Sequence, residues 1–200
     1  MPKYFVYKLT TDNGGAPCVT DDLLTLAICK PSIRSAAAPQ DWVFGFGSNA
    51  LENKLIYVAQ ITDKLKDGIY YEPGRYSRRA DCMYEKDQTG HFNPKKDNQH
   101  PFHGSDAHTL RDLGKYPRYP RAQVLLSTNF RYLGKKGFPA MSADLLAFAR
   151  SLRQGHRSNF ESQPNVTRML RNIQKDLWQA YSSMKVGTRT HTDHTLPCNR

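Results

Sequence analysis

The strands of this chain are marked by runs of apolar and aromatic residues. Residues 4–9 form a continuous run that ends at a glycine-containing loop, which is typical of a strand in the middle of a sheet. Aromatic residues alternate with valine or glycine over residues 42–47, and a third run covers residues 54–61. We therefore expect these two strands to pair antiparallel, and we predict later strands at 122–127 and 130–132.

Glycine at two alternate positions leaves one face of the strand predicted at 42–47 without side chains. Gly45 and Gly47 lower the intrinsic stability of the strand, so their presence needs a local reason. One interpretation is that a ligand or another backbone approaches this face closely. The other is that the strand carries a β-bulge or packs tightly against its neighbours.

Helical spacing of apolar residues predicts three helices. A capping Thr25, followed by apolar residues at helical spacing up to Ile33, predicts a short helix that bends near Pro31. Ser142 caps a second predicted helix. A third helix begins after Pro164 and keeps an amphipathic pattern, and we expect it to serve dimerisation of the chain or docking of a partner.

The order of these elements favours an α+β fold. Helices are too sparse between the strands for a doubly wound parallel sheet, so we predict a small mixed barrel or strongly bent sheet with flanking helices. We divide the chain into a domain of residues 1–160, a C-terminal helical extension of residues 161–186 and a mobile tail of residues 187–200. Residues 67–121 form one long segment whose aromatic content favours an ordered, functional loop.

The balance of charged residues points to a polyanionic partner. The chain has 29 Lys and Arg against 18 Asp and Glu, a formal net charge of +11. This charge favours a nucleic acid, DNA above all, although a merely basic protein is the alternative. The four cysteines form no Cys-x-x-Cys pair, and neither a secretion signal nor a membrane-spanning run of about 20 apolar residues is present. We therefore expect a cytoplasmic protein with reduced thiols and no membrane contact.

Several residues have the chemistry of a nucleophile or an acid–base group. The candidate catalytic residues are Asp41, Cys29 and His156, with His108 as a further acid–base candidate. Cys29 lies on the apolar side of its predicted helix, so a buried, inert thiol is the alternative. The other carboxylates that qualify as a general base are Asp81, Glu85 and Asp112. Spacing in the sequence pairs none of them with another candidate.

Residues with metal-ligating side chains gather in the 67–121 segment. They are Cys82, His91, His100, His103 and His108. Because a paired Cys-x-x-Cys is missing, we interpret them as polar loop residues and predict no metal site. The glycines at positions 14 and 15 lack the spacing of a phosphate-binding loop, so we assign no cofactor to them, and the sequence leaves the cofactor unknown.

Basic and aromatic residues alternate in a manner that suits a nucleobase and its phosphates. Aromatic rings offer stacking faces for an extruded base, and Arg or Lys side chains hold the phosphate backbone. The candidate binding residues are Lys30, Arg34, Trp42, Tyr70, Tyr71, Arg75, Arg78, Arg79, Arg131 and Arg157. The alternative is that most of these aromatics fill the core.

Four short motifs together resemble a known family. They are Cys-Lys-Pro-Ser-Ile-Arg at 29–34, the aspartate-led strand at 41–45, Val-Leu-Leu-Ser at 124–127 with Phe-Arg-Tyr-Leu-Gly at 130–134, and Gly-His-Arg at 155–157. In this order they look like the second family of nucleotide-modification-associated domains, over about residues 1–160. The resemblance implies a link to modified DNA bases in bacteria and phages, without an established reaction.

The first strands and helix are similar, more loosely, to the PUA-like group. That likeness implies an aromatic pocket for a modified base, with Lys30 and Arg34 at its mouth and Trp42, Tyr70 and Tyr71 nearby. The first hypothesis is thus a module that recognises or modifies a DNA or nucleotide base. The alternatives are a transferase-like enzyme acting on a base or nucleotide, and a phage or defence protein that binds a nucleotide signal or a host protein.

Overall fold

The computed structural model describes residues 1–97, 100, 103–153, 155–158, 160 and 162–189. Its elements are β1 (Tyr4–Leu9), β2 (Cys18–Thr20), β3 (Leu23–Leu26), α1 (Pro31–Ala36), β4 (Trp42–Gly47), η1 (Asn49–Leu51), β5 (Leu55–Gln60), β6 (Asp63–Leu65), η2 (Ile69–Tyr71), β7 (Tyr84–Lys86), β8 (Phe92–Pro94), α2 (Asp106–Leu113), β9 (Val124–Ser127), β10 (Asn129–Tyr132), η4 (Gly134–Lys136), α3 (Ala143–Ser151), β11 (His156–Arg157) and α4 (Pro164–Ala180). The α+β class that the sequence predicts is confirmed.

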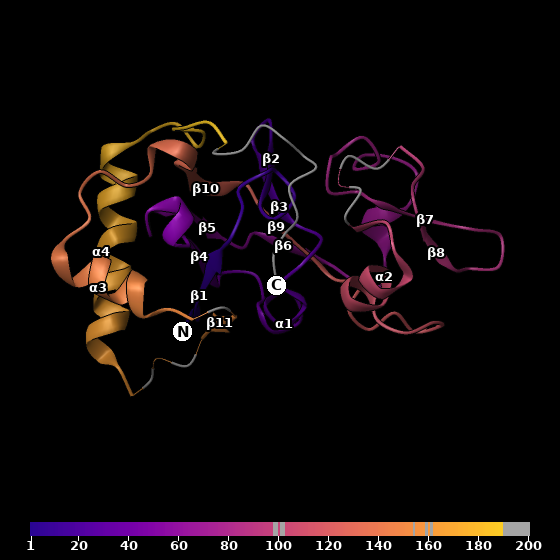
Figure 1. The fold of residues 1–200 in the computed structure, drawn as a ribbon, viewed down its shortest axis with the longest axis horizontal. Coiled ribbons are helices and arrows are strands. Elements are labelled where there is room, and N and C mark those ends of the chain that lie inside the picture. The colour runs from indigo at the N-terminus through magenta and orange to yellow at the C-terminus, as the bar shows by residue number, and fades with distance from the viewer. Residues whose placement is uncertain (98–99, 101–102, 154, 159, 161, 190–200) are drawn as a thin grey trace.

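Within the described ranges, the strands form three sheets and close no barrel. The largest sheet has the order β10-β5-β4-β1-β11, the second has the order β2-β3-β9-β6, and β7 pairs with β8 alone. Figure 1 shows α3 and α4 at one end of the molecule, the two larger sheets in the middle, and α2, β7 and β8 at the other end. We call residues 67–121, which connect β6 to β9 and contain α2, β7 and β8, the insertion.

Side chains of the central strands alternate between the two faces of the large sheet, and each face packs into a different apolar core. β1 lies between β4 and β11, parallel to the first and antiparallel to the second, and β4 pairs antiparallel with β5, as expected. Phe5 and Val43 pack towards the second sheet, whereas Val6 and Phe44 pack beneath α3 and α4. Fully burying one such side chain stabilises the fold by about 1.5–3 kcal/mol, so this alternation fixes the register of the sheet.

The bare face of β4 is filled by protein side chains. A Cβ atom added to Gly45 would lie 2.3 Å from the ring of Tyr57 and 2.7 Å from Leu9. The β4–β5 register also shifts between Gly45 and Phe46, which marks a bulge or irregularity. The interpretation of tight packing is therefore confirmed, and the close approach to Gly45 comes from neighbouring strands.

The helix predicted to begin at Thr25 is wrong in its position. Residues 23–26 form β3, which pairs with β2 and β9, and the Thr25 hydroxyl donates a hydrogen bond to Asp81. The helix α1 begins only at Pro31, because Cys29 and Lys30 have φ angles of 55° and 43° and lie in the left-handed region. Pairing with two neighbouring strands overrides the helical spacing of the apolar residues here.

The C-terminal helix packs into the same core as the central strands. Leu170, Ile173 and Leu177 of α4 are buried in one cluster with Val6 and Phe44. After α4 the backbone hydrogen bonds to β10 and η4 through Met184, Val186 and Thr188. The rest of the expected tail, residues 190–200, lies outside the described residues. No helix in the described part of the chain is long and apolar enough to cross a membrane.

Candidate active site

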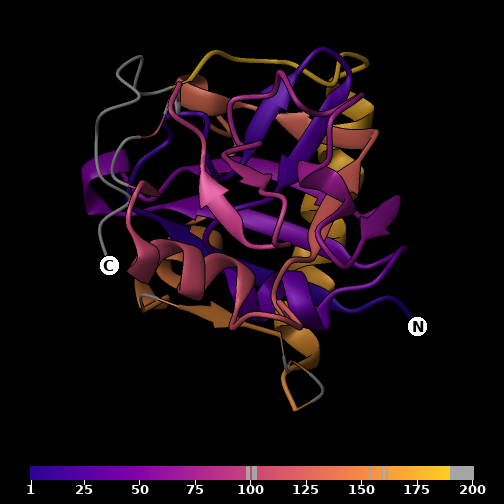
Figure 2. The same cartoon turned by 90° about the vertical axis from the view of Figure 1, so that its right-hand side faces the viewer.

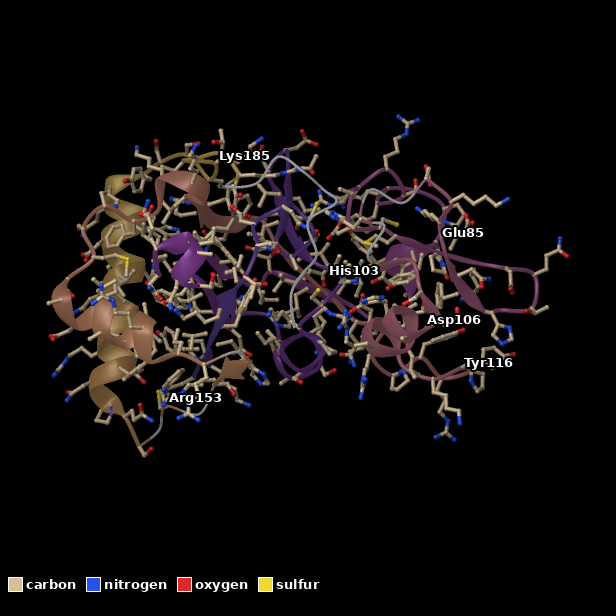
Figure 3. The ribbon with its side chains drawn as sticks, viewed as in Figure 1. Glu85, His103, Asp106, Tyr116, Arg153 and Lys185 are labelled. Carbon is tan, nitrogen blue, oxygen red and sulfur yellow. The ribbon has the colours of Figure 1, made fainter. Side chains whose placement is uncertain are left out.

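A thiol, an imidazole and a carboxylate meet where the insertion joins the sheets. The Sγ atom of Cys29 lies 3.6 Å from Nε2 of His103, and Nδ1 of His103 lies 3.1 Å from Oδ2 of Asp112. Cys29 is partly exposed, whereas His103 and Asp112 are buried. Figure 3 labels His103 at this junction, and Figure 2 views the molecule from the insertion side, where α2 lies beside α1. We call these three residues the triad.

Asp112 is held in its charged form. Burial alone would raise the pKa of this carboxyl group, but the hydrogen bond from His103 and the positive charge of Arg34 outweigh burial and lower the pKa. Its two oxygens also accept hydrogen bonds from the Cys29 backbone N–H at 2.8 Å and from the Tyr84 hydroxyl at 2.9 Å. A charged, fully bonded Asp112 fixes the orientation of the His103 ring.

Arg34 is hydrogen-bonded to the segments that carry Cys29, Asp112 and residues 121–123. Its side chain is fully buried, and its guanidinium donates to the carbonyl oxygens of Cys29 at 2.7 Å and Asp112 at 2.7 Å. It also donates to the carbonyl oxygens of Arg121 and Gln123 and pairs with the Asp112 carboxylate at 3.8 Å. The predicted phosphate-binding residue Arg34 is therefore an internal anchor, closed to any ligand by the backbone that it binds.

The backbone is strained at Cys29 and at the residue after it. Cys29 and Lys30 lie between β3 and α1, and both adopt left-handed φ angles, which residues other than glycine rarely take. Such a conformation costs about 1–2 kcal/mol per residue, and it persists where the surrounding contacts enforce it. Two hydrogen bonds hold the Cys29 backbone in this conformation. Its N–H donates to Asp112, and its carbonyl oxygen accepts from Arg34.

Two further predicted residues lie close to Tyr7 of β1. Lys30 Nζ lies 4.8 Å from the centroid of the Tyr7 ring, and Tyr7 faces His156 in the β1–β11 register. His156 is exposed, and its pKa is lowered by partial burial and by the charge of Lys30. The structure thus places Lys30 and His156 together, with Lys30 directly after Cys29 in the chain.

Asp41, the third predicted catalytic residue, serves the backbone instead. One carboxylate oxygen accepts a hydrogen bond from the Lys3 N–H at 2.7 Å, and the other accepts one from the Ala38 N–H at 2.9 Å. These bonds fix the turn that leads into β4. The structure does not bring Asp41 together with Cys29.

The predicted aromatic residues do not form a common pocket. Trp42 packs on Trp178 of α4, with ring centroids 5.3 Å apart, in the core beneath the helices. Tyr70 and Tyr71 are buried in the separate core of the insertion, where their hydroxyls donate to Asp81 at 2.6 Å and to the Ala27 carbonyl at 2.7 Å. These side chains therefore hold the fold together from two different cores.

The predicted arginines divide into internal and exposed ones. Arg79 donates to the carbonyl oxygens of Cys18 and Leu23, and Arg131 donates to the carbonyl oxygen of Tyr181. Both are therefore engaged with the protein itself. The exposed members of the set are Arg75, Arg78 and Arg157.

The candidate metal ligands are spread over the insertion. Among the described residues, no group of three or more His, Cys, Asp or Glu side chains is arranged to hold a metal ion. Cys82 is buried next to Lys95, His91 stacks on Tyr116 at 3.8 Å, and His108 contacts Ser105 on the surface. His100 is buried, and His103 belongs to the triad.

The comparison with known families agrees with the resemblance of the motifs. The family model of nucleotide modification associated domain 2 matches residues 1–185, which includes α4 and the residues after it up to Lys185. No curated protein and no solved structure matches the chain, so the PUA-like likeness stays a prediction. Because the family model covers most of the chain, the protein belongs to the nucleotide modification associated domain 2 family.

Proposed function

We propose that this protein is an enzyme of nucleotide modification that works by covalent catalysis at Cys29. The observation that carries the proposal is the geometry of the triad, with the thiol next to one imidazole nitrogen and a buried carboxylate next to the other. This arrangement of nucleophile, base and orienting group recurs in acyl-transfer enzymes on unrelated folds. Membership of a nucleotide-modification-associated family supports a nucleotide or nucleobase as the class of substrate.

The residues of the triad take separate roles in two steps. His103 accepts the thiol proton at Nε2, and the Cys29 thiolate attacks an electrophilic carbonyl-type carbon of the substrate. The C–S bond forms, and the leaving group departs with the proton from His103. In the second step His103 takes a proton from water or from an acceptor group, which attacks the same carbon. The C–S bond then breaks, and the proton on His103 returns to the Cys29 sulfur. Asp112 stays ionised and holds the imidazolium that forms in each step.

Selective alkylation of Cys29 tests the role of His103. Iodoacetamide reacts with the thiolate form, so peptide mass analysis of all four cysteines reports how far each one is activated. We expect Cys29 to react at neutral pH roughly tenfold faster than free glutathione, and His103→Ala to remove this advantage. The buried Cys18 and Cys82 are internal controls that stay unmodified in the folded protein.

Two outcomes contradict the proposal. One is a Cys29 that reacts no faster than glutathione, and the other is a rate that His103→Ala leaves unchanged. A positive result leads to incubation with candidate nucleotides, in which a mass increase on Cys29 identifies the covalent intermediate. Cys29→Ser then serves as the variant that binds the substrate without forming that thiol adduct.

We propose binding of nucleic acid as a second function of the same chain. The supporting observation is the distribution of charge, because residues 122–200 hold twelve Lys and Arg against four Asp and Glu. Arg168, Arg171 and Lys175 are exposed on one helix, α4. Changing all three to Ala is expected to weaken DNA binding and to lower its salt slope, and an unchanged slope contradicts this surface.

A further inference from the structure

We infer that the loop after α2 binds single-stranded nucleic acid and leads it to Cys29, so that the substrate is a nucleotide within a strand. The loop comprises residues 114–121, whose last seven residues read Lys-Tyr-Pro-Arg-Tyr-Pro-Arg, and we call it the basic loop. The inference rests on the proposed function and names a surface other than the one on α4. Figure 1 shows α2 and α4 at opposite ends of the molecule.

The basic loop carries three exposed cations and no acidic residue. Lys115, Arg118 and Arg121 are all exposed, and residues 113–143 contain no Asp or Glu. None of the ion pairs between described residues uses a cation of the loop. Successive cations are three residues apart, which is at most about 11 Å between Cα atoms, and salt screens exposed charges over a similar distance of about 8–10 Å. Neighbouring cations of the loop therefore act on one polyanion together.

Hydrogen bonds hold the basic loop in one conformation. The Arg121 N–H donates to the Leu113 carbonyl at 2.8 Å, and the Tyr119 N–H donates to the Lys115 carbonyl at 2.9 Å. The hydroxyl of the buried Tyr119 accepts a bond from the Phe92 N–H at 3.0 Å, which ties the loop to β8. A ligand that binds here orders side chains on a backbone that is already fixed, and this lowers the entropic cost of binding.

An exposed aromatic pair lies next to the first cation of the loop. Tyr116 is 43% exposed, and its ring stacks on His91 with the centroids 3.8 Å apart. The Tyr116 hydroxyl donates to the Thr89 carbonyl at 3.4 Å, which fixes the ring against the turn between β7 and β8. Proteins bind single strands with exposed rings beside Lys and Arg, because unpaired bases offer faces for stacking. A duplex keeps its bases stacked inside, so this combination favours a single strand.

One carboxylate lies in the same turn as Thr89, and its oxygens are engaged within that turn. Asp87 accepts hydrogen bonds from the Thr89 hydroxyl at 2.6 Å, from the His91 N–H at 3.0 Å and from the Asn93 side chain at 2.9 Å. These bonds, the Thr89 bond above all, lower the pKa of Asp87 to about 2, so the group is charged at neutral pH. A negative charge here disfavours a phosphate and tolerates a neutral base. We therefore assign a base to Tyr116 and the phosphates to the cations of the loop.

The last residue of the basic loop is bonded to the candidate active site. The Arg34 guanidinium donates to the carbonyl oxygen of Arg121 at 2.7 Å, as it does to that of Cys29. Figure 3 labels Tyr116 farther from the two larger sheets than His103 of the triad. The loop thus runs from the outer part of the insertion back to the site, which is the course that a strand needs in order to present one nucleotide to Cys29.

Binding of a labelled oligonucleotide across a salt series tests the inference on the full chain. The probe is fluorescein-labelled oligo(dT) of about 12 nucleotides, within the usual site sizes of about 4–16 nucleotides, with oligo(U) and a DNA duplex of equal length beside it. Fluorescence anisotropy measures the affinity from about 50 to about 200 mM salt. The two single strands differ in their sugar, so their relative affinities report whether the loop prefers DNA or RNA.

The decisive variant combines Lys115→Gln, Arg118→Gln and Arg121→Gln. It is expected to weaken binding of oligo(dT) roughly tenfold or more at the lowest salt, because three phosphate contacts are lost. The slope of log affinity against log salt should fall by about 2, since each phosphate contact of a single strand contributes about 0.7.

Two further variants separate charge from stacking and local from overall charge. Tyr116→Ala is expected to weaken binding roughly tenfold without changing the salt slope, and Tyr116→Phe, which keeps the ring, should restore binding. The matched control combines Lys3→Gln, Lys66→Gln and Arg153→Gln, which removes the same net charge from exposed sites outside the loop. We expect this control to keep its affinity within about twofold.

Protection of Cys29 from iodoacetamide tests whether the bound strand reaches the site. At an oligo(dT) concentration that saturates the unchanged protein, alkylation of Cys29 is expected to slow roughly tenfold, because the strand covers the thiol. The combined loop variant should lose this protection at the same concentration. Protection is expressed as the ratio of rates with and without oligo(dT) in each protein, so any effect of a substitution on the thiol itself cancels.

Four outcomes overturn binding at the loop: no binding of any probe, a salt slope that the combined loop variant leaves unchanged, equal losses in that variant and the matched control, or a duplex that binds as tightly as the single strand. Competition by poly-glutamate as strong as that by unlabelled oligo(dT) also overturns it, in favour of an acidic protein. A Cys29 that bound oligo(dT) leaves unprotected overturns the strand as substrate. The proposed function fails separately, through the alkylation rate of Cys29 without nucleic acid.

Discussion

Asp112 and Asp81 are two buried aspartates with similar partners and different consequences. Each lies near an arginine and accepts a hydrogen bond from a tyrosine, Tyr84 for Asp112 and Tyr70 for Asp81. Asp81 also accepts a bond from the Thr25 hydroxyl, so its contacts join the insertion to β3 and end inside the protein. Asp112 instead contacts an imidazole whose other nitrogen reaches a partly exposed thiol.

The two carboxyl groups also differ in the direction of their pKa shifts. Burial raises the pKa of Asp81, and the charge of Arg79 with two hydroxyl bonds does not cancel that effect. For Asp112, the His103 bond and Arg34 do cancel it and lower the pKa. A buried Asp–Arg–Tyr set by itself stabilises the fold, as it does around Asp81. The set around Asp112 differs because its aspartate also contacts an imidazole, and this contact makes it a candidate active site.

The largest expected effect comes from removing the arginine of each set. Arg34→Ala leaves the charged Asp112 and four carbonyl groups without their donor, and we expect the free energy of unfolding to fall by about 3–5 kcal/mol. Arg79→Ala is expected to cost only about 1–3 kcal/mol, because the raised pKa of Asp81 lets that group take up a proton. Urea unfolding of both variants measures the difference, and equal losses would contradict the contrast.

The second-largest expected effect is the change in Cys29 reactivity when either aspartate is replaced by the uncharged Asn. Asp112→Asn is expected to lower the alkylation rate of Cys29 roughly tenfold, because the amide does not stabilise the imidazolium or fix its tautomer. Asp81→Asn is expected to leave that rate unchanged while lowering the stability. Alkylation is measured under conditions in which near-ultraviolet circular dichroism shows both variants folded. A similar loss of reactivity in the two variants would contradict the assignment of Asp112 as the residue that orients His103.

The same two variants should show opposite trends with pH. The lowered pKa of Asp112 contributes stability above the unfolded value near 3.9, and this is lost as the pH falls through the folded value. The raised pKa of Asp81 works the other way, since its contribution declines as the pH rises from the unfolded towards the folded value. As the pH rises, the cost of Asp112→Asn should therefore grow at pH values below about 3.9, whereas the cost of Asp81→Asn should shrink at pH values above about 3.9. Parallel trends in urea titrations would refute the assigned directions.

The smallest effect is expected from the tyrosines. Tyr84→Phe and Tyr70→Phe each remove one hydroxyl bond to a buried carboxylate, which is worth about 1–3 kcal/mol. Only Tyr84→Phe touches the triad, and His103 still orients on Asp112 in that variant, so alkylation of Cys29 should change less than about twofold. A larger change would mean that Tyr84 controls the ionisation of Asp112.

Periodicity in the sequence predicts the elements that one apolar face defines. The strands β1, β4, β5, β9 and β10 and the helices α3 and α4 all appear where the pattern of apolar residues places them. The pattern failed at Thr25, where pairing of β3 with two neighbours and the left-handed turn at Cys29 decide the local structure. Neither influence is visible in the spacing of apolar residues.

The candidate site is predictable only as a list of residues. Cys29, His103 and Asp112 all stand out by side-chain chemistry, but the thiol and the imidazole are separated by 74 positions in the chain. The sequence groups His103 with possible metal ligands, because spacing alone does not show which partner a histidine meets in space. The one local signal was Arg34 at the end of the Cys-Lys-Pro-Ser-Ile-Arg motif, since an arginine among apolar residues needs a buried partner.

The origin of the triad in two parts of the chain has a consequence during protein synthesis. Cys29 leaves the ribosome well before His103 and Asp112, which belong to the insertion. Until the insertion folds onto β3 and α1, the newly made thiol has neither its base nor the contacts that hold its turn. The nascent chain therefore carries an ordinary cysteine, and the proposed nucleophile gains its base only when the insertion docks.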